Sequence, residues 1–104
     1  MKIIGVCACP AGIAHTYMAA ENLENVAKKR GYEVKIETNG SSGVENHLTE
    51  EDIKTADYVI IAADTSVETE RFRGKKMLVT SVTEAVRHVN KIYEQIENDE
   101  VEVY

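Results

Sequence analysis

The sequence predicts an α/β fold in which a parallel sheet lies between two layers of helices. Two almost uninterrupted apolar runs, residues 1–8 and 58–63, are typical of strands buried on both faces of such a sheet. Segments with apolar residues at helical spacing alternate with the strand segments, and this order favours parallel strands covered by helices. We therefore expect a three-layer αβα sandwich of Rossmann-like type, with a four-stranded parallel sheet in the strand order 2-1-3-4.

The first third of the chain predicts a strand, a helix and a second strand. Residues 1–8 form the first strand, and residues 14–30 form the helix because their apolar side chains recur at helical spacing. Gly31 follows three basic residues and stands where a C-cap glycine belongs. Residues 32–38 alternate between apolar and polar side chains, as an edge strand does.

The middle of the chain predicts a loop, a short helix and a buried strand. Residues 39–43, NGSSG, have the composition of a loop. Residues 48–56 contain a capping-box-like start at residues 49–52, which indicates a short helix. The apolar run 58–63 is the third strand, and residues 64–75 are polar and irregular.

The last third predicts a strand and one long helix. Residues 76–80 form the fourth strand, and a second capping box at residues 81–84 starts a helix whose apolar stripe continues to residue 96. We expect one domain over residues 1–97, with the acidic residues 98–104 forming a frayed tail or a linker to another domain.

The charge and the apolar pattern exclude several classes of protein. The 18 acidic residues exceed the 12 basic ones, for a net charge of −6, whereas binding to a phosphate backbone needs a basic face. Nucleic acid is therefore not an expected partner. No apolar run has the length of a membrane span, and residues 3–8 are too short for the apolar region of a signal peptide. A cytoplasmic location is expected.

The cysteines and histidines do not predict a disulfide scaffold or a metal site. Cys7 and Cys9 lie two residues apart, and a small secreted scaffold needs more cysteines than these. His15, His47 and His88 are scattered and lack the paired spacing of zinc ligands. We expect no metal and no cofactor.

Cys9 lies at the junction between the first strand and the first helix, in the stretch ACPAGIAHTY. The N–H groups at a helix start have no acceptor within the helix, and the helix dipole places partial positive charge there. An anion at Cys9 would therefore be stabilised without a cationic side chain, and no lysine or arginine lies nearby in sequence. The same field favours the thiolate, which is the nucleophilic form of cysteine.

The loop after Cys9 has the features of a phosphate-binding loop. Gly12 lets backbone amides approach an anion, the small Ala11 and Ala14 leave space, and Thr16 offers a hydroxyl donor. In the other interpretation, Cys9 only ends a buried strand and the following proline makes a turn. The residues by themselves support the two interpretations about equally.

Three loops are expected to converge on this site, because ligands of such folds bind outside the carboxyl ends of the strands where the strand order reverses. They are residues 9–14, residues 38–43 and the segment from Asp64 onward. Asp64 would repel a phosphate, so we interpret it as a loop residue or a helix cap. Ser41 and Ser42 either line the site or belong to an ordinary turn.

Two other features leave a choice between docking and structure. Residues 70–76, ERFRGKK, form the one basic patch, which either steers an acidic partner or is a solvated connection. Phe72 within it is expected to anchor in the core. Tyr17 and Met18 either offer an apolar docking surface or pack the first helix, with packing favoured.

The motif Cys-Pro-x-Gly-x-Ala-His-Thr and several later segments together resemble one family. ACPAGIAHTYMAAENLE is followed in order by ETNGSSGVEN, LTEEDI, ADYVIIAAD and ERFRGKK. The whole chain is similar to the IIB component of the fructose-type phosphoenolpyruvate-dependent sugar phosphotransferase system. The resemblance implies a fructose-like type-2 EIIB domain that acts as a phosphocarrier.

The resemblance also implies the role of each site residue. Cys9 would accept a phosphoryl group from a phosphohistidine on the IIA component and pass it to a hexose, with fructose as the expected sugar. The membrane transporter IIC would deliver that sugar. The phosphate would be cradled by the loop Pro10, Ala11, Gly12, Ile13, Ala14, His15 and Thr16. His15 is expected to support the site without transferring a proton.

Two departures from the family keep alternative chemistry open. Positions 7 and 11 are often threonine in relatives, whereas this chain has Cys7 and Ala11. Cys7 is either a core residue, which we favour, or the partner of Cys9 in a redox or scaffold domain. A thiol phosphatase of low molecular weight is disfavoured, because His15 stands where that class has arginine and Pro10 is the only proline available for an Asp-Pro acid.

Overall fold

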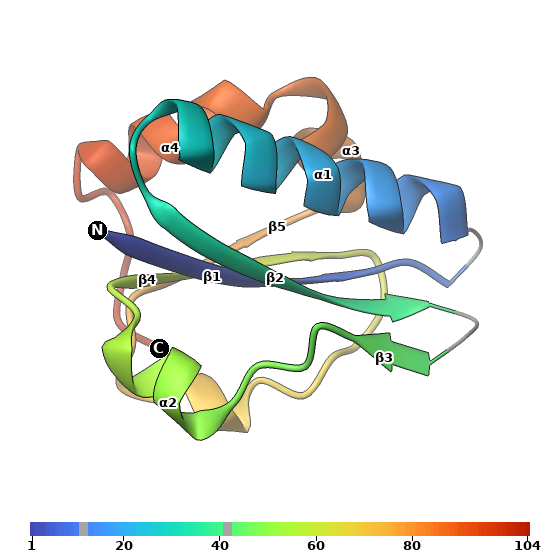
Figure 1. Cartoon of the computed structure of the whole chain (residues 1–104), viewed down its shortest axis with the longest axis horizontal. Coiled ribbons are helices and arrows are strands. Elements are labelled where there is room, and N and C mark those ends of the chain that lie inside the picture. The colour runs from blue at the N-terminus through green and yellow to red at the C-terminus, as the bar shows by residue number, and fades with distance from the viewer. Residues whose placement is uncertain (11–12, 41–42) are drawn as a thin grey trace.

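The computed structural model describes residues 1–10, 13–40 and 43–104, and in these residues a five-stranded sheet forms the centre of the molecule (Figure 1). The sheet order is β3-β2-β1-β4-β5. The strands are β1 (Lys2–Ala8), β2 (Glu33–Gly40), β3 (Gly43–Glu45), β4 (Tyr58–Ala63) and β5 (Met77–Thr80). The helices are α1 (Ile13–Lys29), α2 (Glu50–Thr55), the 3₁₀ helix η1 (Glu70–Phe72), α3 (Val82–Arg87) and α4 (Val89–Glu97).

The predicted α/β class and the order of the four parallel strands are confirmed. β1 pairs in parallel with β2 and with β4, and β4 pairs in parallel with β5. This arrangement is the expected order 2-1-3-4 once the short antiparallel β3 is set aside. Gly31 has a φ of 81°, which is the left-handed conformation expected of the residue that follows α1.

Helices cover both faces of the sheet (Figure 1). The buried side chains of β1 divide between the cores on these two faces. Ile3 and Cys7 belong to the core beneath α1, α3 and α4. Ile4 and Val6 belong to the second core, beneath α2 and η1, which also contains Phe72 as predicted. No described helix is long and apolar enough to cross a lipid bilayer.

The loop expected over residues 39–43 is instead part of a hairpin. β2 runs on to Gly40 and pairs with the antiparallel β3, in which Gly43 has a φ of 100°. β2 is therefore not a free edge over its last residues. Three exposed residues, Gly-Val-Glu, have no alternation from which this strand could be recognised. Ser41 and Ser42 lie outside the described residues.

The single last helix that we expected is divided at His88, which has a non-helical φ and ψ of −133° and 39°. The side-chain amide of Asn22, on α1, donates to the carbonyls of Ala85 and Val86 at 3.4 and 3.0 Å. In a continuous helix these carbonyls would accept from residues 89 and 90. The contact with α1 thus satisfies the carbonyls at which the helix is interrupted.

The acidic segment 98–104 is not a frayed tail, which was one of the two roles expected of it, and its role as a linker stays a prediction. Val101 is 8% exposed and belongs to the core, and Val103 forms an antiparallel bridge with Lys76, just before β5. Backbone hydrogen bonds therefore cover the outer edge of the sheet at this end. The domain limit at residue 97 stays a prediction.

Gly5 on β1 tests how tightly the central strand is packed. A Cβ at this position would lie 2.9 Å from the carbonyl oxygen of Ile60 and 3.0 Å from a methyl of Ile36. We expect Gly5→Ala to lower the free energy of unfolding by about 1–3 kcal/mol. Gly40→Ala is the control, because its Cβ would lie at ordinary contact distance from Tyr17, 3.5 Å from the hydroxyl oxygen and 3.9 Å from Cζ. Urea unfolding measures both, and equal stability of the two variants would contradict this packing.

Candidate functional site

The carboxyl ends of the three central strands lie side by side, as predicted. In register, Ala8 at the end of β1 pairs with Asn39 on β2 and with Ala63 on β4. The N–H of Asp64 donates to the carbonyl of Ala8 at 2.9 Å. The start of α1 and the β2–β3 hairpin lie at this same edge of the sheet (Figure 1).

Cys9 leaves the sheet at this edge, four residues before α1 begins. Its side chain is half-buried and packs against the core beneath α1. Because α1 starts at Ile13, the unpaired amides and the positive end of its dipole lie at the same edge as Cys9. The arrangement provides a half-exposed thiol next to a site that stabilises negative charge.

The other predicted loop residues differ in exposure. Pro10, Ala14 and His15 are exposed, whereas Thr16 is fully buried. The predictions for Ala11 and Gly12 lie outside the described residues, and Ile13 is the first residue of α1. The contact of each loop residue with a phosphate stays a prediction.

Cys7 is a core residue, as expected. It is fully buried, and this burial, together with the charge of Glu24, raises the pKa of its thiol to about 12. The thiol is therefore protonated near neutral pH and is a poor partner for thiol–disulfide exchange. The redox alternative for Cys7 and Cys9 loses its support.

Asp64 acts as a helix cap, one of the two roles expected of it. Its Oδ1 accepts from the N–H of Val82, the first residue of α3, at 3.3 Å. The hydroxyl of Ser81 accepts from the N–H of Glu84 at 3.1 Å in the same turn. Asp64 therefore holds the start of α3 beside the strand edge that carries Cys9.

A groove of about 210 Å³ lies between the first turns of α1 and the helix α3. His15 and Met18 line it from α1, Asp64 lines it from the strand edge, and Arg87 lines it from α3. Met18 is exposed, so the prediction that favoured core packing for this residue is wrong. Sequence reasoning missed Arg87, because 72 positions separate it from His15 and only the packing of α3 against α1 brings the two together.

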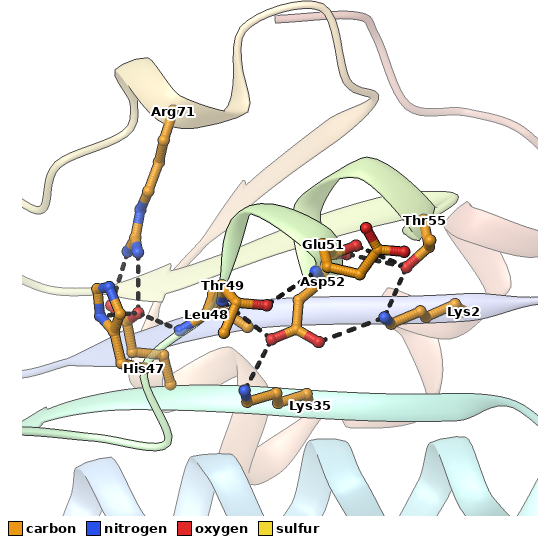
Figure 2. A network of polar contacts seen from close by, with 10 residues as sticks. Lys2, Lys35, His47, Leu48, Thr49, Glu51, Asp52, Thr55 and Arg71 are labelled. Atoms are coloured by element: carbon orange, nitrogen blue, oxygen red, sulfur yellow. Dashed lines mark hydrogen bonds and ion pairs between the residues drawn. The ribbon is translucent and has the colours of Figure 1, made fainter.

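A second cavity, of about 410 Å³, opens at the same edge on the other face of the sheet. Its lining includes Glu37, a carboxylate on β2 that is only 2% exposed. The Arg71 guanidinium donates to both oxygens of Glu37, at 2.9 and 2.6 Å, and the N–H of Leu48 donates to one of them at 2.9 Å. His47 lies 3.2 Å from the same carboxylate (Figure 2).

The ionised form of Glu37 is favoured by this network. Burial opposes ionisation, but the hydrogen bonds from Arg71 and Leu48 outweigh it and hold the pKa of Glu37 below its usual range. Most charges of the basic patch are paired within the chain, which neither interpretation of the patch anticipated: Arg71 binds Glu37, Arg73 binds Glu70, and Lys76 binds Asp99. Lys75 donates to the backbone carbonyls of Lys54 and Ala56.

On the α2 face of the sheet, the Asp52 carboxylate joins α2 to the strands β1 and β2 (Figure 2). It accepts from Lys35 on β2 at 2.7 Å and from Lys2 on β1 at 3.4 Å. It also closes the predicted capping box, because it accepts from the N–H of Thr49 at 2.9 Å. The hydrogen bond from Lys35, followed by that from Thr49, holds the pKa of Asp52 well below its usual range.

The hairpin is tied to the first helix by a side-chain contact. The Tyr17 hydroxyl on α1 donates to Glu45 on β3 at 2.9 Å. This contact links the helix that follows the first expected segment, residues 9–14, to the strand that follows the second, residues 38–43.

Comparison with known proteins gives the chain a clear set of relatives. Residues 4–95 match the sequence model of the family described as "PTS system, Lactose/Cellobiose specific IIB subunit". The chain is 52% identical over 97 residues to the PTS system fructose-like EIIB component 2 of Escherichia coli K12, with 92% of each chain covered.

A second relative is a much longer protein. The chain is 48% identical over 103 residues to the PTS system fructose-specific EIIABC component of Bacillus subtilis, covering 99% of this chain. It spans only 16% of the length of that relative. Among solved structures, a domain of the fructose-specific IIABC component of Borrelia burgdorferi matches with a TM-score of 0.93 at 46% identity, covering 99% of this chain and 97% of that one.

The pair between Glu37 and Arg71 predicts a large loss of stability when the guanidinium is removed. Glu37 is buried, whereas Arg71 is 19% exposed and other donors to Glu37 remain, so we expect Arg71→Met to cost about 2–4 kcal/mol at pH 7. Arg73→Met is the matched control, because its pair with Glu70 is exposed and should leave unfolding nearly unchanged.

The same pair gives this loss a pH dependence. Because the pKa of Glu37 is lowered by folding, the stabilisation is present above its ordinary value of 4.5 and is lost as the pH falls below it. The difference between the native protein and Arg71→Met should therefore shrink in acid. Urea unfolding from pH 7 down to pH 3 measures this, and a constant difference would contradict the assignment.

Proposed function

We propose that this chain, which belongs to the IIB family of the sugar phosphotransferase system, carries a phosphoryl group on Cys9 between a phosphohistidine donor and a sugar. One observation carries the proposal: Cys9 directly follows the central strand and lies four residues before α1, at the strand edge where such folds bind ligands. Fructose-like IIB relatives that match almost the whole chain support the same assignment.

The proposed reaction has two in-line steps. In the first, the Cys9 sulfur attacks the phosphorus of the phosphohistidine, the P–N bond breaks, and its electron pair stays on the imidazole nitrogen. In the second, a sugar hydroxyl oxygen attacks the phosphorus, the P–S bond breaks, and the thiolate is regenerated, while the hydroxyl proton is lost to a base outside this chain. Positioning and charge stabilisation dominate such transfers.

The residues of this chain supply the charge stabilisation in both steps. The start of α1 carries partial positive charge equivalent to about half an elementary charge, which favours the thiolate and the phosphoryl oxygens alike. Residues 10–16 are the proposed cradle. His15 is exposed in the first turn of α1, where it supports the site.

The competing chemistries are not favoured. A thiol phosphatase clamps phosphoryl oxygens with a planar arginine, and this chain has His15 at the corresponding place. A redox pair would need a reactive Cys7, which is buried with a raised pKa. A carrier benefits from a site that does not hydrolyse its own phosphocysteine.

We further propose fructose as the sugar, IIA as the donor and the membrane transporter IIC as the component that delivers the sugar. The names of the relatives support fructose, whereas the matched family model is described by lactose and cellobiose. The chain would act in the cytoplasm at the inner face of the membrane. One relative is an EIIB component of similar length, and another is a longer EIIABC component. Both support a domain that acts either as a separate protein or within a longer chain.

Phosphorylation of Cys9 can be tested by intact mass. After incubation with phosphorylated IIA, or with the general phosphotransferase proteins and phosphoenolpyruvate, we expect a gain of one phosphoryl group. Cys9→Ser should lose this gain, and Cys7→Ala should keep it, because alanine fits the apolar site of Cys7. No gain from a donor shown to be phosphorylated would exclude the proposal.

A further inference from the structure

Arg87 differs from the other arginines in having no partner among the described residues. Arg30 binds Glu97, Arg71 binds Glu37 and Arg73 binds Glu70. Within residues 1–10, 13–40 and 43–104, no hydrogen bond or ion pair forms at Arg87. An unpaired guanidinium in a chain of net charge −6, with 18 carboxylate side chains available, is free to bind an external anion.

The groove lined by Arg87 opens beside Cys9. Asp64, which lines the groove, donates its N–H to the carbonyl of Ala8, the residue before Cys9. His15, on the other wall, belongs to the first turn of the helix that follows Cys9. A protein that brings a phosphoryl group to Cys9 would therefore contact this groove.

The shape and chemistry of the groove fit a protein surface better than a phosphate. Val82 and Val86 make its apolar wall on α3, and Met18, 48% exposed, extends that wall from α1. Arg87 and His15 are among its polar lining residues. An apolar side chain flanked by a carboxylate would fill the wall and pair with the guanidinium.

We infer that this groove is the docking site of the phosphohistidine-bearing donor protein, and that Arg87 pairs with a carboxylate on the donor surface. The inference rests on the proposed function and adds to it the residue that recognises the donor. No lysine or arginine lies near Cys9 in the sequence, and Arg87 on α3 provides a positive charge near the site that contacts the partner. Arg87 thus positions the donor, whereas the start of α1 stabilises the transferred group.

Charge reversal at Arg87 tests the inference. In Arg87→Glu, the donor concentration that gives half-maximal transfer to Cys9 should rise about 10-fold, with the maximal rate changed less than about twofold. The half-maximal donor concentration of Arg87→Lys should lie between those of the native protein and Arg87→Glu, because lysine keeps the charge but not the bidentate geometry. The difference from the native protein should shrink as salt is raised.

Lys28→Glu is the matched control. Lys28 is exposed, and like Arg87 it is a basic residue in the last turn of its helix, so both reversals have the same charge change and the same effect on a helix dipole. Lys28 lies at the far end of α1 from the groove and should leave the half-maximal concentration unchanged.

The possible results separate this inference from the proposed function. If Arg87→Glu behaves like Lys28→Glu, or lowers the maximal rate alone, donor docking through Arg87 is wrong while Cys9 remains the carrier. If the native protein itself takes up no phosphoryl group, the proposed function fails instead.

Discussion

The pairing of β1 between β2 and β4 is the constraint on which the rest of the structure depends. β1 is buried from Ile3 to Ala8. Because β2 and β4 pair with it in parallel and in register, the carboxyl ends of all three strands lie at one edge of the sheet. The same register decides which side chains face each helical layer, so Cys7 enters the core beneath α1. Cys9 then emerges where the strand order reverses, which is the place where α/β sheets bind ligands.

The two faces of this edge have different chemistry. On the α1 face, Cys9 lies near the start of a helix, and the positive charge comes from backbone amides and from Arg87, which lines the groove. On the α2 face, Glu37 is neutralised within the chain by Arg71. The internally paired arginine is structural, whereas the unpaired one is available for a partner.

Much of the fold followed from local sequence patterns, and the remainder depended on contacts between distant residues. The continuous apolar runs identified β1 and β4, and the cysteine at a strand-to-helix junction identified the candidate site. At the interruption before α4, the carbonyls of Ala85 and Val86 accept from Asn22, more than 60 residues away. The buried pair of Glu37 with Arg71 spans 34 positions, and each residue alone resembled an ordinary surface charge. Such pairings arise only once the sheet order is set.

The central claim is that the phosphoryl group on Cys9 lies against the first turn of α1. Backbone amide ¹H–¹⁵N spectra of the protein before and after phosphorylation test this placement most directly. We expect the largest changes at the amides from Ile13 to His15, because the N–H groups of the first turn have no acceptor within the helix and would bind the phosphoryl oxygens. Unchanged signals there, with the largest changes at His47 and Arg71 on the other face, would contradict it.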